Sequence, residues 1–185
     1  MSTLIDQLHS DTSQLLTHLT EKGEMSLHSF ANGNLRKVLL LSAASWFETR
    51  ISEAILKFAE VHSNGHSGIQ SLIKKKAVDR QYHTYFDWKK EKPGPFYGLF
   101  GDVCGEDMKK EINADSNIKD GLAAFLELGN LRNELVHENF AAFPFNKTAE
   151  EVHALYQKAE KFVSYVERRL PDPTLGRPVT ATDAE

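Results

Sequence analysis

The sequence is poor in cysteine and contains no long hydrophobic run, and each absence excludes a class of protein. Cys104 is the only cysteine among 185 residues, so a single chain can form neither an internal disulfide nor a zinc site with several thiolate ligands. No apolar run approaches the roughly 20 residues that a membrane-spanning helix requires. The first residues also lack the basic and apolar regions of a signal peptide. We therefore expect a cytoplasmic protein that does not cross a membrane.

Basic residues are outnumbered by acidic ones, 22 against 26, but they are concentrated in one region. The chain has a formal net charge of -4, whereas residues 70–95 contain seven lysines and arginines against three acidic residues. Because charges at the surface are screened beyond roughly 8 Å, this local excess can attract phosphates even in an acidic protein. The alternative is an ordinary solvated surface.

Apolar residues recur at helical spacing along most of the chain, and no segment shows a convincing strand pattern. Helices are expected at Ser2–Lys22, Asn34–Val61, Ile69–Val78, Glu106–Asn113, Asn117–Val136, and from a capping box at Thr148–Glu151 to Leu170. The helix at 34–61 is apolar on nearly all sides in its first half, which is typical of the centre of a bundle. Pro-Gly-Pro and spaced glycines predict a long irregular segment at 87–105.

The sequence thus predicts an all-α fold, a single-domain helical bundle of about five main helices with a long central loop. The length suits one domain with a substantial core. We expect the bundle to occupy residues 1–170. The tail at 171–185 has too little apolar content to pack and is expected to be disordered.

The stretch LGNLRNELVHENF, residues 128–140, contains polar residues that an ordinary amphipathic helix would not need. At 100° per residue, Arg132 falls within the apolar stripe formed by Ala124, Phe125, Leu128, Leu131 and Leu135. A buried guanidinium is costly unless an anion or other acceptor pairs with it. Glu48, on the expected central helix, is the most plausible partner within the chain.

A second stripe of the same helix contains Leu122, Leu126, Gly129, Asn133 and His137. Apolar side chains and a glycine that permits close approach are typical of a surface that meets another protein chain. We therefore expect a homodimer through the helix at 122–137.

Arginine and histidine together suit the cleavage of RNA without a metal. Arginine can bind a phosphate through two nitrogens, and histidine can transfer protons near neutral pH. One histidine cannot easily act as both base and acid, whereas two copies related by a two-fold axis could supply both. On an ideal helix Arg132 and His137 lie about 140° apart. Either the helix unwinds before His137, or Arg132 reaches a cleft shared with a second chain.

The segment RNELVH, residues 132–137, resembles the R-x4-6-H motif of the HEPN superfamily, and it is the only such match in the chain. The resemblance implies a dimeric helical bundle with a composite, metal-independent ribonuclease site. By position, it implies that Arg132, His137 and Asn133 form the catalytic site, with Asn133 as a supporting polar residue. The central-helix sequence around Glu48 also resembles an acidic helix of this superfamily, which implies that Glu48 supports the site.

HEPN proteins are common in bacterial toxin–antitoxin, abortive-infection and CRISPR systems, so the resemblance implies an RNA substrate and an antitoxin or defence-complex partner. One branch carries a tyrosine two residues after the histidine, where this chain has Asn139. Control by adenylylation of that tyrosine is therefore not expected. The alternative function is a non-catalytic interaction or nucleotide-binding module within a larger defence complex.

The remaining candidates are surface lysines, aromatic residues and two histidines. Lys89, Lys90 and Lys92 are expected to contact the RNA backbone. The aromatic residues among them, such as Trp88, could stack on bases, although packing within the bundle is the favoured interpretation. His62 and His66 have metal-like spacing but no further ligand nearby. We therefore expect no metal and no cofactor.

Overall fold

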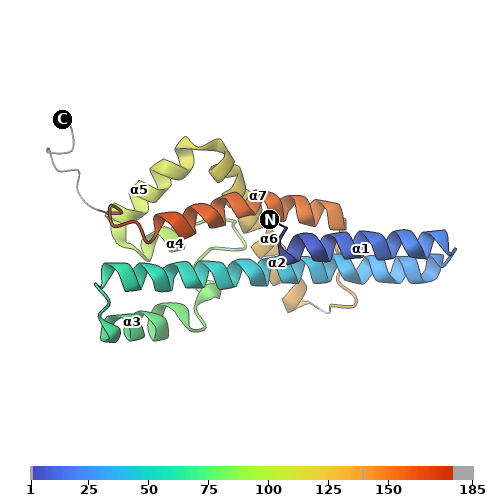
Figure 1. Cartoon of the computed structure of the whole chain (residues 1–185), viewed down its shortest axis with the longest axis horizontal. Helices are drawn as coiled ribbons and strands as arrows, with labels where there is room; N and C mark the ends of the chain where they lie inside the picture. Colours follow the sequence, from blue (N-terminus) through green and yellow to red (C-terminus); the bar gives the residue numbers. More distant parts are fainter. Residues whose placement is uncertain (1, 139, 177–185) are drawn as a thin grey trace.

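The computed structural model describes residues 2–138 and 140–176, and these residues form a helical bundle (Figure 1). The described residues contain seven α-helices: α1 (Leu4–Glu21), α2 (Met25–His62), α3 (Ser67–Ile73), α4 (Gly94–Gly98), α5 (Gly101–Ala114), α6 (Ser116–His137) and α7 (Ala149–Arg169). They contain no β-strand, only an isolated bridge between Asp87 and Lys92. The all-α prediction is confirmed, but the expected number of about five helices was too low because α3 and α4 are short.

Helix α2 is the longest element, and the others are arranged along it. Its 38 residues correspond to a length of about 57 Å. After a tight turn at Gly23, the first half of α2 runs back along α1 (Figure 1). Helix α7 packs along the second half of α2. The α1–α2 hairpin therefore projects beyond the end of α7.

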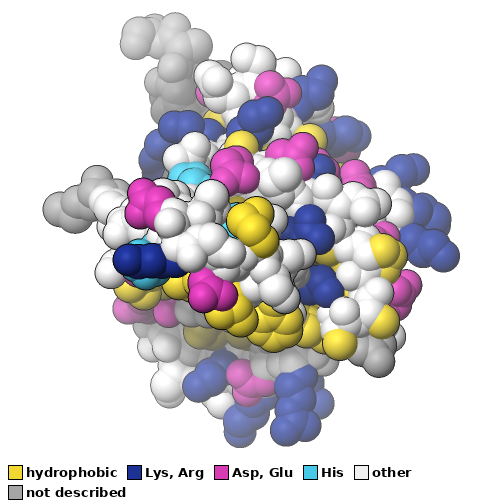
Figure 2. Space-filling model, turned by 90° about the vertical axis from the view of Figure 1, so that its right-hand side faces the viewer, with side chains coloured by type: hydrophobic (Ala, Val, Ile, Leu, Met, Phe, Trp, Pro, Cys, Tyr) yellow, Lys and Arg dark blue, Asp and Glu magenta, His cyan; other side chains and the backbone are white. Residues whose placement is uncertain are grey.

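The projecting end of the molecule exposes apolar side chains of α2. Figure 2 looks onto this end and shows hydrophobic side chains among charged ones. Met25, Leu27 and Phe30 are more than half exposed here. No helix in the described part of the chain is long and apolar enough to span a membrane.

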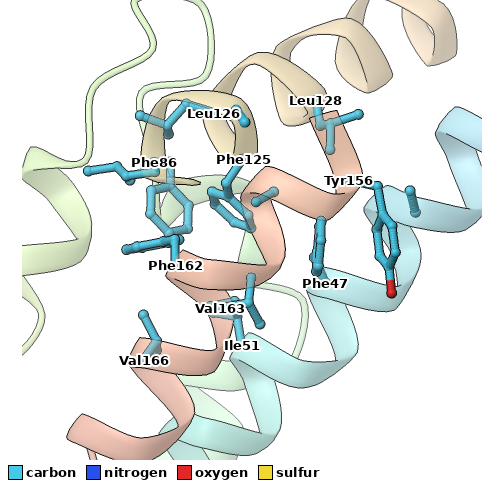
Figure 3. Packing of buried hydrophobic residues seen from close by; sticks show 14 of the residues in the cluster. Phe47, Ile51, Phe86, Phe125, Leu126, Leu128, Tyr156, Phe162, Val163 and Val166 are labelled. Atoms are coloured by element: carbon cyan, nitrogen blue, oxygen red, sulfur yellow. The ribbon is translucent and has the colours of Figure 1, made fainter. Parts of the chain in front are cut away.

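The hydrophobic core lies where α2, α6 and α7 meet (Figure 3). Phe125 of α6 contacts both Phe47 of α2 and Phe162 of α7. Helices α6 and α7 cross closely at Gly121, where a Cβ atom would lie 2.7 Å from the carbonyl oxygen of Lys158. The core therefore fixes α6 tightly between the other two long helices.

Three segments differ from the sequence-based expectation. Helix α2 begins at Met25 rather than near residue 34, although its first turn has no side-chain cap. The segment expected to be irregular at 87–105 contains α4, and α5 already begins at Gly101. Helix formation is tolerated in α4 because Pro95 lies in the first turn, where its missing N–H would have no helical partner.

The expected end of the domain at residue 170 also needs adjustment. Leu175 is buried, and Gly176 lies against the sulfur of Cys104, so residues 171–176 pack on the bundle. The rest of the expected tail, residues 177–185, lies outside the described residues, as does Asn139. The predicted capping box of α7 is confirmed by the hydrogen bond from the backbone N–H of Glu151 to Oγ1 of Thr148.

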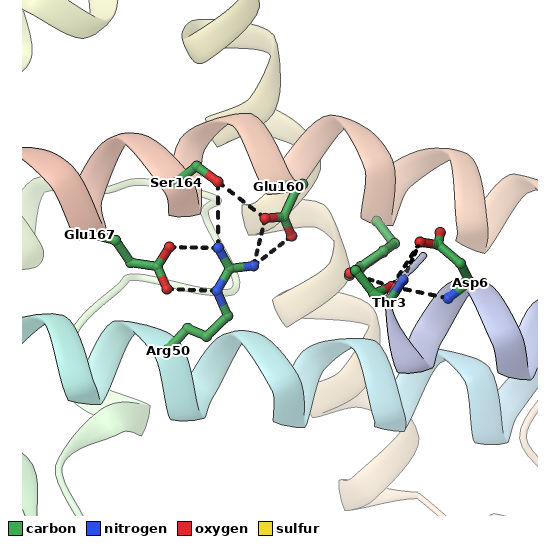
Figure 4. Close-up of polar contacts among 7 residues, drawn as sticks. Thr3, Asp6, Arg50, Glu160, Ser164 and Glu167 are labelled. Atoms are coloured by element: carbon green, nitrogen blue, oxygen red, sulfur yellow. Dashed lines mark hydrogen bonds and ion pairs between the residues drawn. The ribbon is translucent and has the colours of Figure 1, made fainter. Parts of the chain in front are cut away.

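Arg50 joins α2 to α7 through two carboxylates (Figure 4). Its guanidinium lies 2.6 Å from a carboxylate oxygen of Glu160 and 2.6 Å from one of Glu167, and only 13% of its side chain is exposed. The hydrogen bonds and charges of Glu167 and Glu160 raise the pKa of Arg50 above its ordinary value, which reflects how strongly the two carboxylates stabilise the cation. At the other end of α7, Tyr156 donates a hydrogen bond to Thr3, the N-cap of α1.

We predict that Arg50→Met lowers the free energy of unfolding by about 2 kcal/mol, because two partly buried glutamates lose their shared cation. The matched control is Lys57→Met, which breaks the exposed pair of Lys57 and Glu60 on the same helix. That change should cost no more than about 0.5 kcal/mol. Chemical denaturation measures both, and equal losses would contradict the structural role of Arg50.

Candidate active site

Arg132 lies at the edge of the core, where α6 faces the middle of α2. Its Nη2 is 3.8 Å from a carboxylate oxygen of Glu48, and 35% of its side chain is exposed. Its Nη1 donates a 3.0 Å hydrogen bond to Oδ1 of Asn133. The structure therefore brings together Arg132, Asn133 and Glu48, and Glu48 is the partner expected for Arg132 within the chain. The guanidinium remains accessible from outside.

Two adjoining pockets meet at Arg132. A small one lies over α6 and is lined by Arg132, Asn133 and aromatic residues, with His83 at its edge. A larger, open one, of about 410 Å³, extends over α2 and is lined by Glu48, Arg80, His83 and Arg132 among others. Arg80 and His83 could not be assigned to the site from the sequence, because they belong to no recognisable motif and reach the site only through tertiary packing.

Trp88 holds the segment that contains Arg80 and His83 against α6. Its indole ring lies over Gly129, where a Cβ atom would be 2.0 Å from Cζ3 of Trp88. The indole Nε1–H donates a 3.1 Å hydrogen bond to the carbonyl of His83. Gly129 thus provides the space for Trp88, and Trp88 fixes the backbone of the short 3-10 helix Tyr82–Thr84 beside Arg132.

The charges of the site act on two tyrosines beneath it. Burial raises the pKa of Tyr82, the carboxylate of Glu48 raises it further, and the positive charge of Arg132 opposes this effect. Burial is the main cause that raises the pKa of Tyr85 to about 12, and the negative charge of Glu48 contributes to the same effect. Both phenols therefore remain protonated near neutral pH and cannot serve as bases. Tyr85 is already committed as a donor to the carbonyl of Ala77.

His137 does not join Arg132 in either pocket. Helix α6 continues to His137 without unwinding, and the histidine is exposed. Unwinding of the helix before His137, the first of the two alternatives, is therefore excluded, while a cleft shared with a second chain stays a prediction. Within one chain, the motif supplies the pockets with its arginine and asparagine but not with its histidine.

The expected dimer surface on α6 is largely covered by the chain itself. Leu122 and Leu126 are 8% and 3% exposed, and Trp88 covers Gly129. The expectation that Leu122 and Leu126 form a free surface was wrong, because both side chains are buried within the chain itself. Gly129, under Trp88, and Asn133 are half-buried, whereas His137 is exposed.

The aromatic residues between α3 and α5 fill the interior. Tyr85, Phe86, Trp88 and Phe96 are buried, which confirms the packing interpretation and leaves none of these four free to stack on bases. Lys89, Lys90 and Lys92 are exposed on the turn that follows Trp88. Asn130 of α6 contacts Glu91 of this turn at 3.4 Å, and Lys92 lines a separate pocket with residues of α4 and α5.

The chain after α6 turns back along α2. Lys37, which is 5% exposed, donates a 2.6 Å hydrogen bond from Nζ to the carbonyl of Phe140 and lies 5.2 Å from the centre of its ring. Phe145 is buried and packs beside Arg36. Phe140 itself remains 37% exposed near His137.

His62 and His66, the two histidines with metal-like spacing, make hydrogen bonds that stabilise the fold. His62 contacts the carbonyl of Leu170 at 3.1 Å, which ties the end of α2 to the end of α7. His66 accepts a hydrogen bond from the backbone N–H of Ile69 as the N-cap of α3. Among the described residues, no group of three or more histidine, cysteine or acidic side chains could hold a metal ion.

Comparison with known proteins agrees with this fold and motif. The sequence model of one family, RiboL-PSP-HEPN, matches residues 6–172, which include every long helix and the RNELVH segment. The chain belongs to the RiboL-PSP-HEPN family. Neither a search of curated proteins nor a search of solved structures found a match.

In this RiboL-PSP-HEPN protein, the site is suited to binding an anion at an exposed guanidinium. Arg132 is oriented by Asn133 and only loosely paired with Glu48, so its nitrogens can turn toward a phosphate. The roles of Arg132, Asn133, Glu48 and His137 remain predictions, but the first three share one accessible location.

We predict that Gly129→Ala lowers the free energy of unfolding by about 2 kcal/mol, because the new methyl group overlaps the ring of Trp88. Gly33→Ala is the control, since Gly33 also lies within a helix but has no atom within 4 Å of the added Cβ. That variant should gain about 0.5–1 kcal/mol. Denaturation curves, together with faster amide exchange in residues 82–98 of the first variant, test the docking of Trp88. Unchanged stability of Gly129→Ala would disprove it.

Proposed function

We propose that this HEPN protein is a metal-independent endoribonuclease that acts in the cytoplasm. The observation that carries the proposal is an accessible arginine of the family's R-x4-6-H motif, held beside Glu48 at an open pocket. Membership in the HEPN superfamily supports a role in RNA metabolism. The setting of phage defence or a toxin–antitoxin system, and a partner protein from it, belong to the proposal as well.

The reaction is an attack by the ribose 2′-hydroxyl on the adjacent phosphorus. A base removes the 2′-hydroxyl proton, the 2′-oxygen bonds to phosphorus, and the bond from phosphorus to the 5′-oxygen breaks. The leaving oxygen takes a proton, which gives a 2′,3′-cyclic phosphate and a 5′-hydroxyl. Arg132 binds the phosphate and stabilises the charge that develops on it, while Asn133 and Glu48 orient the guanidinium.

His137 fits this reaction best as a residue supplied across a dimer. It is exposed at the end of α6, and its own chain's Arg132 points elsewhere. Val136, 53% exposed, and Phe140, 37% exposed, flank it with apolar surface. We propose that two copies pair through this end of α6, so that the His137 of one copy approaches the Arg132 pocket of the other.

Lys89, Lys90 and Lys92 can hold the RNA on either side of the cleaved bond. All three are exposed, and Lys90 has only a 3.4 Å contact with Asp87, on a side chain that is 71% exposed. Exposed ion pairs of this kind contribute little, so the ammonium groups are available for phosphates.

The second candidate function is a non-catalytic module that binds a nucleotide or a partner protein at the Arg132 pocket. The position of His137 outside the pockets favours it, since binding an anion needs no proton transfer. This candidate predicts that RNA is bound but not cleaved, and that expression does not arrest growth.

We predict that the purified protein cleaves RNA in the presence of EDTA and leaves 2′,3′-cyclic phosphate ends. Arg132→Ala and His137→Ala should each lower the cleavage rate by roughly 100-fold or more. Arg168→Ala, an exposed arginine on α7, is the matched control and should cleave as wild type. Single-turnover assays on folded variants measure the rates. RNA binding without cleavage by the wild type would favour the non-catalytic module.

We also predict that Val136→Glu converts the dimer to a monomer and lowers the cleavage rate, because it places two charges in the proposed contact. The control is Val38→Glu, which changes another exposed valine on a different helix. Sedimentation velocity reports the oligomeric state, and circular dichroism reports the fold. A wild-type monomer with full activity would exclude a site shared between copies.

A further inference from the structure

The larger pocket beside Arg132 contains more functional groups than the motif requires. Glu48 and Ser52 come from α2, Arg80 and His83 from the segment after α3, and Arg132 from α6. His83 and Arg132 line both pockets, so they face the same space. Sequence resemblance assigns a role only to Glu48 and Arg132.

Arg80 adds a second guanidinium to this pocket. It is exposed, and its backbone has a φ of +61°, a conformation that side chains other than glycine rarely adopt. Within the described residues its side chain makes no hydrogen bond and no ion pair. Arg80 thus has an unfavourable backbone conformation and no polar contact that anchors its side chain, and such backbone strain is frequent at ligand sites.

His83 adds a second histidine. Its carbonyl is fixed by Trp88, whereas its imidazole is exposed and has no hydrogen-bond partner in the described part of the chain. The backbone is therefore held rigidly beside Arg132 while both ring nitrogens remain free. Histidine in such a position can accept or donate a proton near neutral pH.

We propose that His83 is the general base of the RNA-cleavage reaction and that Arg80 is a second phosphate ligand. Both act in the same chain as Arg132, and the proposal rests on the function proposed above. His83 takes the 2′-hydroxyl proton as the 2′-oxygen bonds to phosphorus. The phosphorus–O5′ bond breaks, and the 5′-oxygen takes its proton from the His137 of a second copy. Arg80 and Arg132 neutralise the phosphate from two sides.

This assignment explains why one histidine of the motif can suffice for each copy. A base and an acid are both needed, and they must lie on opposite sides of the phosphorus. His83 lines the pocket in the same chain as Arg132, and His137 is supplied by the second chain. The site then has two arginines and two histidines without any metal.

The test compares His83→Gln and Arg80→Gly with Arg132→Ala. His83→Gln should lower single-turnover cleavage by roughly 100-fold or more, with binding of a 2′-O-methyl RNA unchanged. Arg80→Gly should weaken binding of that RNA while thermal stability is maintained, because glycine suits the positive φ. His18→Gln, an exposed histidine on α1, is the control for both measurements and should match wild type.

An RNA with a 5′-bridging sulfur distinguishes base from acid, because a thiolate leaves without being protonated. This substrate should restore cleavage by His137→Ala but not by His83→Gln. Equal restoration of both variants would overturn the role of His83 as base. Mixing His83→Gln with Arg132→Ala should restore no activity if both residues act in one chain, so recovery on mixing would overturn the placement in one chain.

The outcomes separate the two proposals. If Arg132→Ala is impaired but both His83→Gln and Arg80→Gly cleave and bind as wild type, the inference about Arg80 and His83 fails and the ribonuclease function stands. If the wild type does not cleave RNA, the proposed function fails and the role of His83 as base fails with it.

Discussion

The need to cover the second apolar face of α6 governs the structure of this protein. One face packs on α2 and α7 in the core, and on the other Leu122 and Leu126 are buried as well. Trp88 packs on this second face at position 129, where it fits because the residue is a glycine. The same contact that completes the core therefore determines where Arg80 and His83 lie. Folding and site assembly depend on one interface.

Arg50 and Arg132 differ in how far they are buried and in how many carboxylates pair with them. Arg50 has two carboxylates at 2.6 Å and little exposure, so its charge is fully used within the fold. Arg132 has one carboxylate at 3.8 Å and far more exposure. An arginine of the first kind stabilises helix packing, whereas one of the second kind retains the capacity to bind an anion from solution. Arg50 thus ties α2 to α7, while Arg132 on α6 keeps an accessible guanidinium beside α2.

The sequence was sufficient where the determining interactions are local or periodic. The cap at Thr148, the core stripe through Phe125 and Leu128, and the contact of Arg132 with Glu48 could all be predicted. Periodicity identifies an apolar face but not what covers it, which is why Leu126 was mistaken for an interface residue. His83 could not be found because its proximity to Arg132 results from the docking of Trp88 on Gly129, a contact between residues far apart in the sequence.

The two tryptophans lie in very different surroundings. Trp46 lines the groove between α1 and α2, whereas Trp88 lines the small pocket at Arg132. Indole emission depends on the polarity and the quenching groups around the ring. In a chain with Trp46 replaced by phenylalanine, the remaining indole fluorescence would come from Trp88 in the lining of the small pocket. The protein thus contains an intrinsic optical reporter, and occupancy of the pocket can be followed in real time without a label.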